Sequence, residues 1–594
     1  MPHRKKLIEV ALPLEAINVA SAREKSIRHG HPSTLHLWWA RRPLAACRAV
    51  IFASLVDDPG HPEPNPDAPP AFVEACQKLP KGRNARGENE EGRSNDTPRM
   101  RLFDFIERLV TWEATTDDDI LCQARKLIRL STDGNPPPLL DPFAGGGSIP
   151  LEAQRLGLEA HASDLNPVAV MINKALIEIP PRFANMPPVN PEDGARASSS
   201  HPAGKTQALP VKGEWKGAAG LAADVRYYGQ WMRDRAEERI DHLYPDCNGE
   251  TVIAWLWART VKCPNPACGA QMPLVRSFDL SRKKGKRAWV EPHVDSQTRE
   301  ITFHVRQAEK GKGPKGTVNR RGARCLACDT AVPFPHVRTE GQQGRMKAKL
   351  MAVVTEGAQG RNYHSPDSAQ VEAAEKANPT WRPDHALPHN PRDFKTPNYG
   401  METFADLFTP RQLVALTTFS DLVNEAREQI RADAVAAGLP DDDTPLRDGG
   451  TGARAYAEGV SVYLAFGVDK ATDYWSTIAT WMPRGTVGHV FARHAIPMVW
   501  DYPEANPLAE FHCAWNELME WIAKSLGTLR PACSGYAQQQ DATSLTSESA
   551  IPISTDPPYY DNIGYADLSD YFYSWMRPSL RGVYPGLFST LLVP

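Results

Sequence analysis

The chain has 594 residues, enough for several folding units, and 41% of them are hydrophobic, which suffices for sizeable cores. Its formal net charge of −3 provides no global field that attracts nucleic acid, so any such attraction must be local. No apolar run reaches the roughly 18 residues of a membrane span, and the opening segment is a poor signal peptide, so we expect a cytoplasmic protein without a membrane anchor.

The N-terminal residues 1–56 are expected to be mostly helical, with an apolar helix over Leu35–Leu55 in which Pro43 begins a new segment. The simplest interpretation of this region is a packed helix pair whose arginines are solvated. Residues 57–100 are rich in Pro, Gly, Asn and charge, which is typical of a linker or a disordered loop. Helical periodicity returns over Arg101–Leu130.

Residues 139–167 contain a strand, a glycine-rich turn, a helix, a second strand and an acidic tip. The turn Asp141–Gly147, DPFAGGG, lets a ligand approach bare backbone. Ser148–Leu156 should be helical, with Gly157 as its C-terminal cap. Asp164 ends the second strand, where open α/β sheets place ligands. The pattern predicts a nucleoside-binding half-unit, of which a dinucleotide fold is one version.

Two cysteine pairs follow a second linker and an aromatic stretch, Ala218–Ala258, that we expect to be helical. Ten cysteines in so long a chain, four of them in paired spacing, favour a reducing cytosol and metal binding over disulfides. The paired cysteines have the spacing of a structural zinc ribbon, and scattered structural cysteines are the alternative. They are Cys263, Cys268, Cys325 and Cys328.

The insert between the cysteine pairs is basic and includes Lys283, Lys284 and Arg287. It is either a solvated loop or a phosphate-contacting surface, and we favour the second because clustered Lys and Arg suffice for such contact. Residues 340–400 look irregular. Thr409 is the expected N-cap of a long helix, and further helices are expected over Ala453–Asp473 and Leu508–Leu526.

The segment Asp556-Pro557-Pro558-Tyr559 follows a short strand predicted over Ile551–Thr555. The Asp556 carboxylate and the Pro557 carbonyl suit an exocyclic amine, which becomes nucleophilic when acceptors hold its hydrogens out of the ring plane. Tyr559 offers a flat face for an extruded base. Such chemistry needs mainly positioning and electrostatics. A Pro-Pro turn after a strand is also a common structural feature.

The DPFAGGGS turn and the DPPY segment together resemble the cofactor loop and catalytic motif of amino-group DNA methyltransferases, which bind S-adenosylmethionine. Residues 31–51, HPSTLHLWWARRPLAACRAVI, resemble the segment that closes over the methionine end of that cofactor. The N-terminal block, together with YDN at 560–562 and YADLSDYF at 565–572, resembles the zinc-ribbon-bearing adenine-specific DNA methylases of bacteria and archaea.

The resemblance implies an α/β fold with a Rossmann-like methyltransferase core and a large, mostly helical insert that carries the zinc ribbon. It assigns catalysis to Asp556, Pro557, Pro558 and Tyr559. In that family, Asp at the first position favours adenine or another nucleobase over a glutamine side chain. The cofactor-binding residues that it implies are Thr34, Pro43, Asp141, Phe143, Ala144, Gly145, Gly147, Asp164 and Asp541.

The expected division of the chain follows from these motifs. The segments are a helical cofactor-closing segment 1–56, a linker 57–100, core 101–180, a linker 181–215, a helical insert 216–258, zinc ribbon 259–340, a further insert 341–535 and the catalytic part of the core 536–594. A methyltransferase sheet needs about three more strands after the catalytic tip. Either this chain is therefore a fragment or another chain completes it.

Two functional hypotheses remain open at this point. The first is an enzyme that methylates adenine in double-stranded DNA, in restriction-modification or phage defence. The second is a zinc-ribbon nucleic-acid-binding protein that retains an inactive or incomplete methylase scaffold. Intact Asp164, Asp556 and Tyr559 favour the first, the missing strands favour the second, and RNA stays open as a substrate.

Overall fold

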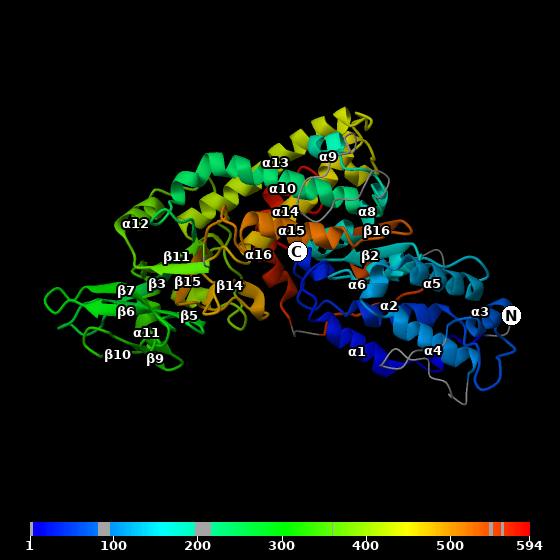
Figure 1. Cartoon of the computed structure of the whole chain (residues 1–594), viewed down its shortest axis with the longest axis horizontal. Helices are drawn as coiled ribbons and strands as arrows, with labels where there is room; N and C mark the ends of the chain where they lie inside the picture. The colour runs from blue at the N-terminus through cyan, green and yellow to red at the C-terminus, as the bar shows by residue number, and fades with distance from the viewer. Residues whose placement is uncertain are drawn as a thin grey trace.

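The computed structural model describes residues 4–80, 96–196, 215–358, 360–545, 551–559 and 563–593. It is a mixed α/β protein of elongated shape (Figure 1). N-terminal helices lie at one end, a β-rich lobe lies at the other, and long helices run between them. Within the described ranges, every helix is either too short or too polar to traverse a lipid bilayer.

A small parallel sheet organises the middle of the molecule. Its order is β1 (Leu139–Asp141), β2 (Ala160–Asp164), β16 (Gly535–Gln539), so strands from distant parts of the chain flank β2. The sequence does not indicate β16. Because the three strands run parallel, their carboxyl ends meet at one edge, where open sheets bind ligands.

The strand predicted over Ile551–Thr555 is only a single bridge. Ile553 pairs in parallel with Leu140 on the outer side of β1. The Leu140 N–H donates to the Pro552 carbonyl at 3.0 Å, and the Ser554 N–H donates to the Leu140 carbonyl at 3.1 Å. Pro552 has no N–H to extend this ladder. The bridge nevertheless brings the chain into Asp556 beside the end of β1.

The glycine turn and the helix after it match the prediction. Helix α6 (Ser148–Arg155) starts directly after Gly147, and Gly157 has a φ of +84° in the predicted cap. Helix α7 (Pro167–Asn173) follows β2 and is capped by Asn166, whose side-chain oxygen accepts from the Val168 N–H at 3.0 Å. It continues through a π-helical turn, η4 (Lys174–Glu178), into α8 (Ile179–Arg182).

The N-terminal helices differ from the prediction. The expected helix over Leu35–Leu55 is wrong in its first half, because α2 spans only Leu44–Leu55 and residues 35–43 are largely irregular. Pro43 disfavours helical backbone in the residue before it. Helix α1 (Leu14–Glu24) precedes this segment. The Arg48 guanidinium of α2 is buried against Glu152 of α6, with Nε to Oε2 at 2.6 Å, and joins the two helices.

The expected linker 57–100 contains ordered structure. Helix α3 (Pro70–Gln77) buries Phe72 and Cys76, and α4 (Pro98–Leu109) begins inside the same range. The helix expected over Arg101–Leu130 is two helices, α4 and α5 (Asp118–Ser131). In the second linker, α9 (Pro191–Arg196) is helical, while residues 197–214 and 81–95 lie outside the described residues.

The β-rich lobe is built on β3 (Val252–Lys262). Its neighbours are β11 (Lys347–Gly357) on one side and β15 (Asp501–Ala505) on the other, with β12 (Gly360–His364) outside β11 and β4 (Gln271–Leu274) on the end of β3. The helix expected over Ala218–Ala258 is therefore wrong after Ile240. Asn248 and Gly249 have positive φ and end that region in a turn.

This sheet crosses the predicted domain boundaries. The boundary expected at 258/259 falls inside β3, and β11 and β15 come from the segment 341–535 that was expected to be irregular and helical. Two small antiparallel sheets complete the β-rich lobe, and α11 (Phe334–Gln342) follows them in the chain. The first of these sheets contains β5 (Asp279–Lys283), β6 (Lys286–Val294) and β7 (Ile301–Ala308). The second contains β8 (Val318–Asn319), β9 (Gly322–Arg324) and β10 (Ala331–Val332).

The long helices lie between the lobe and the parallel sheet. Thr409 caps α13 (Pro410–Ala436) as predicted, in a capping box with Gln412. The helix expected over Ala453–Asp473 is confirmed as α14 (Ala453–Thr472), whereas α15 starts later than expected, at Trp515, and ends at Leu526. The remaining elements of this region are α10 (Ala219–Ile240), α12 (Ser368–Glu375), α16 (Tyr565–Leu580), β13 (Thr480–Met482) and β14 (Thr486–Gly488).

Candidate functional site

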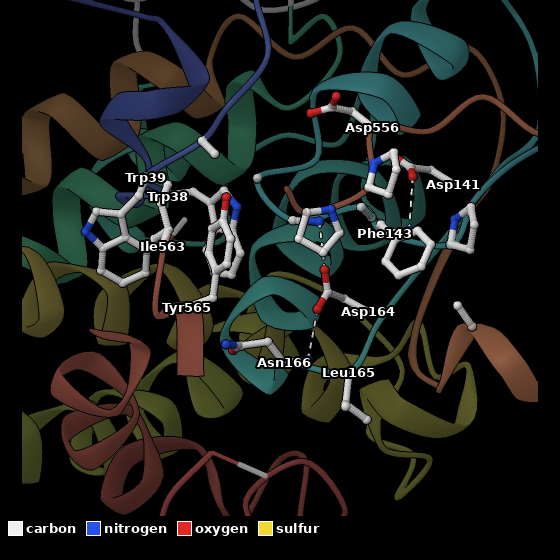
Figure 2. A pocket seen from close by; sticks show the side chains of 18 of the residues that line it. Trp38, Trp39, Asp141, Phe143, Asp164, Leu165, Asn166, Asp556, Ile563 and Tyr565 are labelled. Atoms are coloured by element: carbon white, nitrogen blue, oxygen red, sulfur yellow. Dashed lines mark hydrogen bonds between the residues drawn. The ribbon is translucent and has the colours of Figure 1, made fainter. Parts of the chain in front are cut away.

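A cavity of about 600 Å³ lies at the carboxyl ends of the parallel strands (Figure 2). This volume lies within the range of ligand-binding sites. Its walls come from segments that are far apart in the chain: Trp38–Arg42, Asp141–Gly146, Ser148, Ile149, Asp164–Asn166, His494, Gln540–Thr543, Asp556–Tyr559, Ile563, Tyr565, Ala566 and Val593. The glycine turn and the DPPY segment, predicted separately, therefore line one cavity.

The Asp164 carboxylate holds the glycine turn by a hydrogen bond. Asp164 Oδ2 accepts from the Gly145 N–H at 2.9 Å, and Asp164 Oδ1 accepts from the Asn166 N–H at 2.9 Å. Burial raises the pKa of Asp164, and these two backbone donors oppose that shift. Each oxygen keeps a further lone pair for a ligand, because an ionised carboxylate accepts about four hydrogen bonds.

Positive φ values explain the glycines of the turn. Gly145 has a φ of +47°, and a Cβ there would lie 2.7 Å from Nε1 of Trp38. Gly147 has a φ of +78°, and a Cβ there would lie 2.8 Å from Oδ1 of Asn173. Gly145 lines the cavity. Gly147, which was predicted to bind cofactor, does not line it, and its role is to let the turn pack on Asn173.

Asp141 connects the end of β1 to the DPPY segment. Its side chain is 1% exposed, and Oδ1 accepts from the Thr555 hydroxyl at 2.7 Å and the Phe143 N–H at 3.2 Å. Burial, reinforced by the charges of Asp164 and Asp556, raises the pKa of Asp141 to about 7. Asp141 therefore titrates near neutral pH while it holds the residue before Asp556 in place.

The DPPY segment is paired with an arginine from the N-terminal block. The Arg42 guanidinium donates to both carboxylate oxygens of Asp556 and to the Tyr559 hydroxyl. Its Cζ lies 5.3 Å from the centroid of the Tyr559 ring, which is a cation–π contact. Tyr559 is 63% exposed, so its ring borders the mouth of the cavity. Arg42 is not among the site residues predicted from the sequence.

Residues 38–42 form a wall of the cavity that packs against the glycine turn. The Trp38 ring stacks on Tyr565 with centroids 5.5 Å apart and planes at 16°, as Figure 2 shows. Arg41 donates to the Gly146 carbonyl, and burial lowers the pKa of Arg41 to about 10. The Trp-Trp and Arg-Arg pairs of the sequence are the signal for this wall, but a packed apolar helix with solvated arginines explains them equally well.

Two other expected cofactor contacts are absent from the cavity lining. Thr34 lies outside it, with its hydroxyl donating to the His31 carbonyl at 2.7 Å. Pro43 also lies outside it and caps α2. Residues 35–43 are not helical, and Trp38–Arg42 in this segment line the cavity. Thr34 and Pro43, at the two ends of the segment, do not.

The remaining predicted cofactor residues line the cavity. Asp141, Phe143, Ala144, Gly145 and Asp164 do so together with Asp541, which follows β16. The Asp541 carboxylate accepts from the Thr543 N–H and hydroxyl, both at 2.8 Å, and the backbone bond is the main cause that lowers the pKa of Asp541. Phe143 and Leu165 add apolar side chains that are 39% and 51% exposed, and Leu165 was not predicted.

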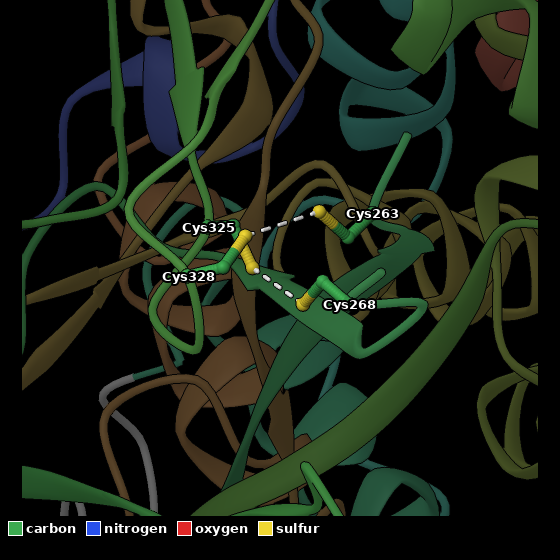
Figure 3. Close-up of side chains that lie close together, drawn as sticks. All are labelled: Cys263, Cys268, Cys325 and Cys328. Atoms are coloured by element: carbon green, nitrogen blue, oxygen red, sulfur yellow. Dashed lines mark hydrogen bonds between the residues drawn. The ribbon is translucent and has the colours of Figure 1, made fainter. Parts of the chain in front are cut away.

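The four predicted cysteines form a possible metal site in the β-rich lobe (Figure 3). Their Sγ atoms all lie within 4.8 Å of one another, and two contacts across the pairs measure 3.7 Å and 3.9 Å. A tetrahedral zinc with Zn–S bonds of about 2.3 Å requires Sγ–Sγ distances of about 3.8 Å. The donor set therefore fits zinc, in accordance with the sequence prediction.

Two similar loops present these cysteines. Cys263 follows β3 and Cys325 follows β9, and each loop reverses through a residue with a φ of +60°, Gly269 in one and Asp329 in the other. The Cys263 N–H donates to the Ala270 carbonyl at 2.9 Å, and the Cys325 N–H donates to the Thr330 carbonyl at 3.0 Å. All ten cysteines of the chain are free thiols, so none of these four is engaged in a disulfide.

The predicted basic insert is a hairpin rather than a loop. Lys283 ends β5, Lys284 lies in the turn with Gly285 at a φ of +76°, and Arg287 lies on β6. Lys283 and Lys284 are exposed and Arg287 is half-buried. The neighbouring Arg282 is paired with Asp279 at 2.9 Å. The hairpin tip thus carries exposed cations on a rigid antiparallel sheet.

Comparison with known proteins covers only the N-terminal part of the chain. A family model described as "Protein of unknown function (DUF1156)" matches residues 11–76. No curated protein and no solved structure matches significantly. The matched segment includes Trp38–Arg42, so one wall of the cavity lies within a region that resembles this family.

Proposed function

We propose that this chain is an S-adenosylmethionine-dependent methyltransferase that acts on the exocyclic amino group of adenine in DNA. The observation that carries the proposal is the single cavity shared by the glycine turn with Asp164 and by Asp556–Tyr559. Such a cavity offers one end for a nucleoside-containing cofactor and another for a flat base. The parallel strands around β2 are then the described part of a Rossmann-like core.

The residues at the strand ends fit the cofactor. In our proposal the Asp164 carboxylate accepts from the ribose hydroxyls through the lone pairs that Gly145 and Asn166 leave unused. Asp541 lies at the end of the neighbouring strand and takes the adenine end, while Phe143 and Leu165 cover the ring faces. When bound, S-adenosylmethionine supplies an activated sulfonium methyl group. The side chains that we assign to its binding are therefore polar at the ribose and apolar at the ring.

The DPPY segment fits the target amine. The Asp556 carboxylate and the Pro557 carbonyl accept its two hydrogens, which makes the nitrogen lone pair available for transfer. The Tyr559 face stacks on the extruded base. This arrangement stabilises the amine as it gains positive charge, so its effect grows toward the transition state.

The β-rich lobe fits nucleic-acid binding. In our proposal a structural zinc at Cys263, Cys268, Cys325 and Cys328 holds the base of the lobe, and the hairpin with Lys283, Lys284 and Arg287 contacts phosphates of double-stranded DNA. We propose that this activity serves restriction-modification or phage defence. A nucleic-acid-binding protein with an inactive scaffold is the second candidate, because Arg42 engages both oxygens of Asp556.

Labelled methyl transfer tests the proposal. The full chain is incubated with tritiated S-adenosylmethionine and adenine-containing duplex DNA, and N6-methyladenine is identified after digestion. The wild type is expected to transfer label. The Asp556→Ala variant should lose at least about 100-fold in turnover but still bind the cofactor in calorimetry, because the side chain touches the target and not the cofactor.

Two results would contradict the proposal. Appreciable methylation by the Asp556→Ala variant would show that the DPPY segment does not have the proposed catalytic role. DNA binding by a wild type that binds no S-adenosylmethionine would favour the binding-protein alternative.

A further inference from the structure

Arg42 occupies the positions that the target base needs. Its guanidinium donates to both oxygens of Asp556 and to the Tyr559 hydroxyl, and it lies over the Tyr559 ring. Under the proposed function the amine must reach the same carboxylate and the base must stack on the same ring. With Arg42 in this place, both carboxylate oxygens of Asp556 and the face of the Tyr559 ring are already engaged.

Arg42 and its partner Asp556 are partly exposed to solvent. The Arg42 side chain is 38% exposed, that of Asp556 is 30% exposed, and the pair bridges two segments that are irregular in backbone. Arg41, the neighbouring cation, is buried against the Gly146 carbonyl. Among the described residues that line the cavity, Arg41 and Arg42 are the only Lys or Arg. Arg42 is therefore the exposed permanent cation of this lining.

Separating the pair requires a new anion for the guanidinium. A phosphate group accepts the planar fork of arginine in the same bidentate manner as a carboxylate. A nucleotide brings such a group beside its base, whereas a nucleoside does not. A neutral ligand would leave the guanidinium without a counter-charge at the mouth of the cavity.

We propose that Arg42 exchanges partners when substrate binds. It pairs with Asp556 and Tyr559 in the empty site, and it pairs with a phosphate of the target nucleotide when the base enters. The exchange restricts the catalytic tip to adenine that carries a phosphate. This inference rests on the proposed function, because it takes Asp556–Tyr559 as the place where the target base binds.

Binding of three small probes tests the exchange without any turnover. Calorimetry with S-adenosylhomocysteine present compares 2′-deoxyadenosine with its 5′- and 3′-monophosphates on the full chain. The wild type should bind one monophosphate about tenfold or more tightly than the nucleoside, as one charge-assisted contact implies. In the Arg42→Gln variant that ratio should fall below about twofold, while the nucleoside binds more tightly than to the wild type.

Two further variants separate this role from a structural one. Arg42→Lys keeps the charge without the fork and should retain part of the ratio. Arg23→Gln removes an exposed arginine of α1 that pairs with Glu113, so it makes the same charge change outside the cavity and should keep the wild-type ratio. Loss of fold in Arg42→Gln would lower the affinity for all three probes together and leave the ratio unchanged.

The outcomes distinguish this inference from the proposed function. A wild type without phosphate preference, or an Arg42→Gln variant that keeps both the preference and its affinity for 2′-deoxyadenosine, overturns the exchange. If the wild type also methylates DNA in the labelled assay, the proposed function stands without it. The remaining outcome is a protein that transfers no methyl group but still shows a phosphate preference that Arg42→Gln abolishes. That result supports the exchange and contradicts the proposed methyltransferase function.

Discussion

Three carboxylates in one cavity have different properties because their surroundings differ. Asp164 is held by two backbone donors, and Asp556 is paired with Arg42. Asp141 is 1% exposed and accepts from two neutral donors, the Thr555 hydroxyl and the Phe143 N–H. Burial therefore dominates and raises its pKa to about 7. We therefore expect Asp141 to change charge near neutral pH.

The raised pKa predicts how stability depends on pH. A carboxyl group whose pKa is higher in the folded state than in the unfolded state contributes most below its unfolded pKa of about 4. That contribution is lost as the pH rises through about 7, where folded Asp141 ionises. The loss is on the order of 4 kcal/mol at most, since each tenfold change in proton affinity between the two states corresponds to about 1.4 kcal/mol.

The Asp141→Asn variant tests this. An amide keeps the acceptor oxygen for Thr555 and Phe143 but does not ionise. The melting temperature of the wild type should therefore fall relative to that of the variant between about pH 4 and pH 7. Thermal unfolding followed by circular dichroism across this range measures the difference. Parallel curves for the two proteins would show that Asp141 does not titrate in that window.

Motif residues of the site were predictable and their partners were not. Asp164, Asp556 and Tyr559 stand out because glycine turns and Pro-Pro segments restrict the backbone around them. Arg42 and Trp38 stand in an apolar stretch where helical periodicity offered an equally good explanation. Only the tertiary fold places Arg42 and Trp38 in the cavity. The sequence points to Thr34 and Pro43 as the cofactor-binding residues of this segment instead.

At the scale of elements, short strands were the main difficulty. The sequence predicts β1, β2 and α6 because turn residues mark their ends. In β16 the residues are Gly-Tyr-Ala-Gln-Gln, which have neither alternation nor a β-branched residue, so pairing with β2 decides its conformation. The aromatic run of β3 fits a helix by sequence alone, but in the structure it is a central strand buried on both faces.

The two cysteine loops predict a zinc-dependent lobe. The Cys325→Ser variant should lose about one zinc per chain and destabilise the β-rich lobe, because metal binding energy there is folding energy. Plasma emission spectroscopy measures the metal, and hydrogen exchange of β8–β10 measures the lobe. Cys122→Ser is the matched control, since Cys122 is an exposed thiol on α5 outside the cluster. A wild-type protein without metal and with full protection of these strands would contradict the assignment.

At the scale of the whole molecule, the basic hairpin and the cavity belong to different regions. Figure 1 shows the hairpin strands β5 and β6 in the lobe opposite the N-terminal helices. With a net charge of −3, the chain has no general attraction for DNA. A local cluster of exposed cations must therefore supply the phosphate contacts if DNA is bound.

Charge reversal tests this division. The triple variant Lys283→Glu, Lys284→Glu, Arg287→Glu should bind duplex DNA more weakly by a similar factor for every sequence. Three lost phosphate contacts should lower the slope of log affinity against log salt concentration by up to about 3. Fluorescence anisotropy over a salt series measures both quantities. The matched control reverses the charges of Lys78, Lys126 and Arg129, which are exposed at the other end of the molecule. This control should keep the wild-type slope.

The same variant separates docking from chemistry. The hairpin contributes no residue to the cavity, so cofactor affinity should be unchanged and turnover at saturating DNA should stay near that of the wild type. The defect should lie in the DNA concentration needed for half-maximal rate. If affinity falls for one DNA sequence only, the hairpin contacts base edges instead of phosphates. If turnover falls at saturating DNA, the hairpin acts on the cavity and its role is not docking alone.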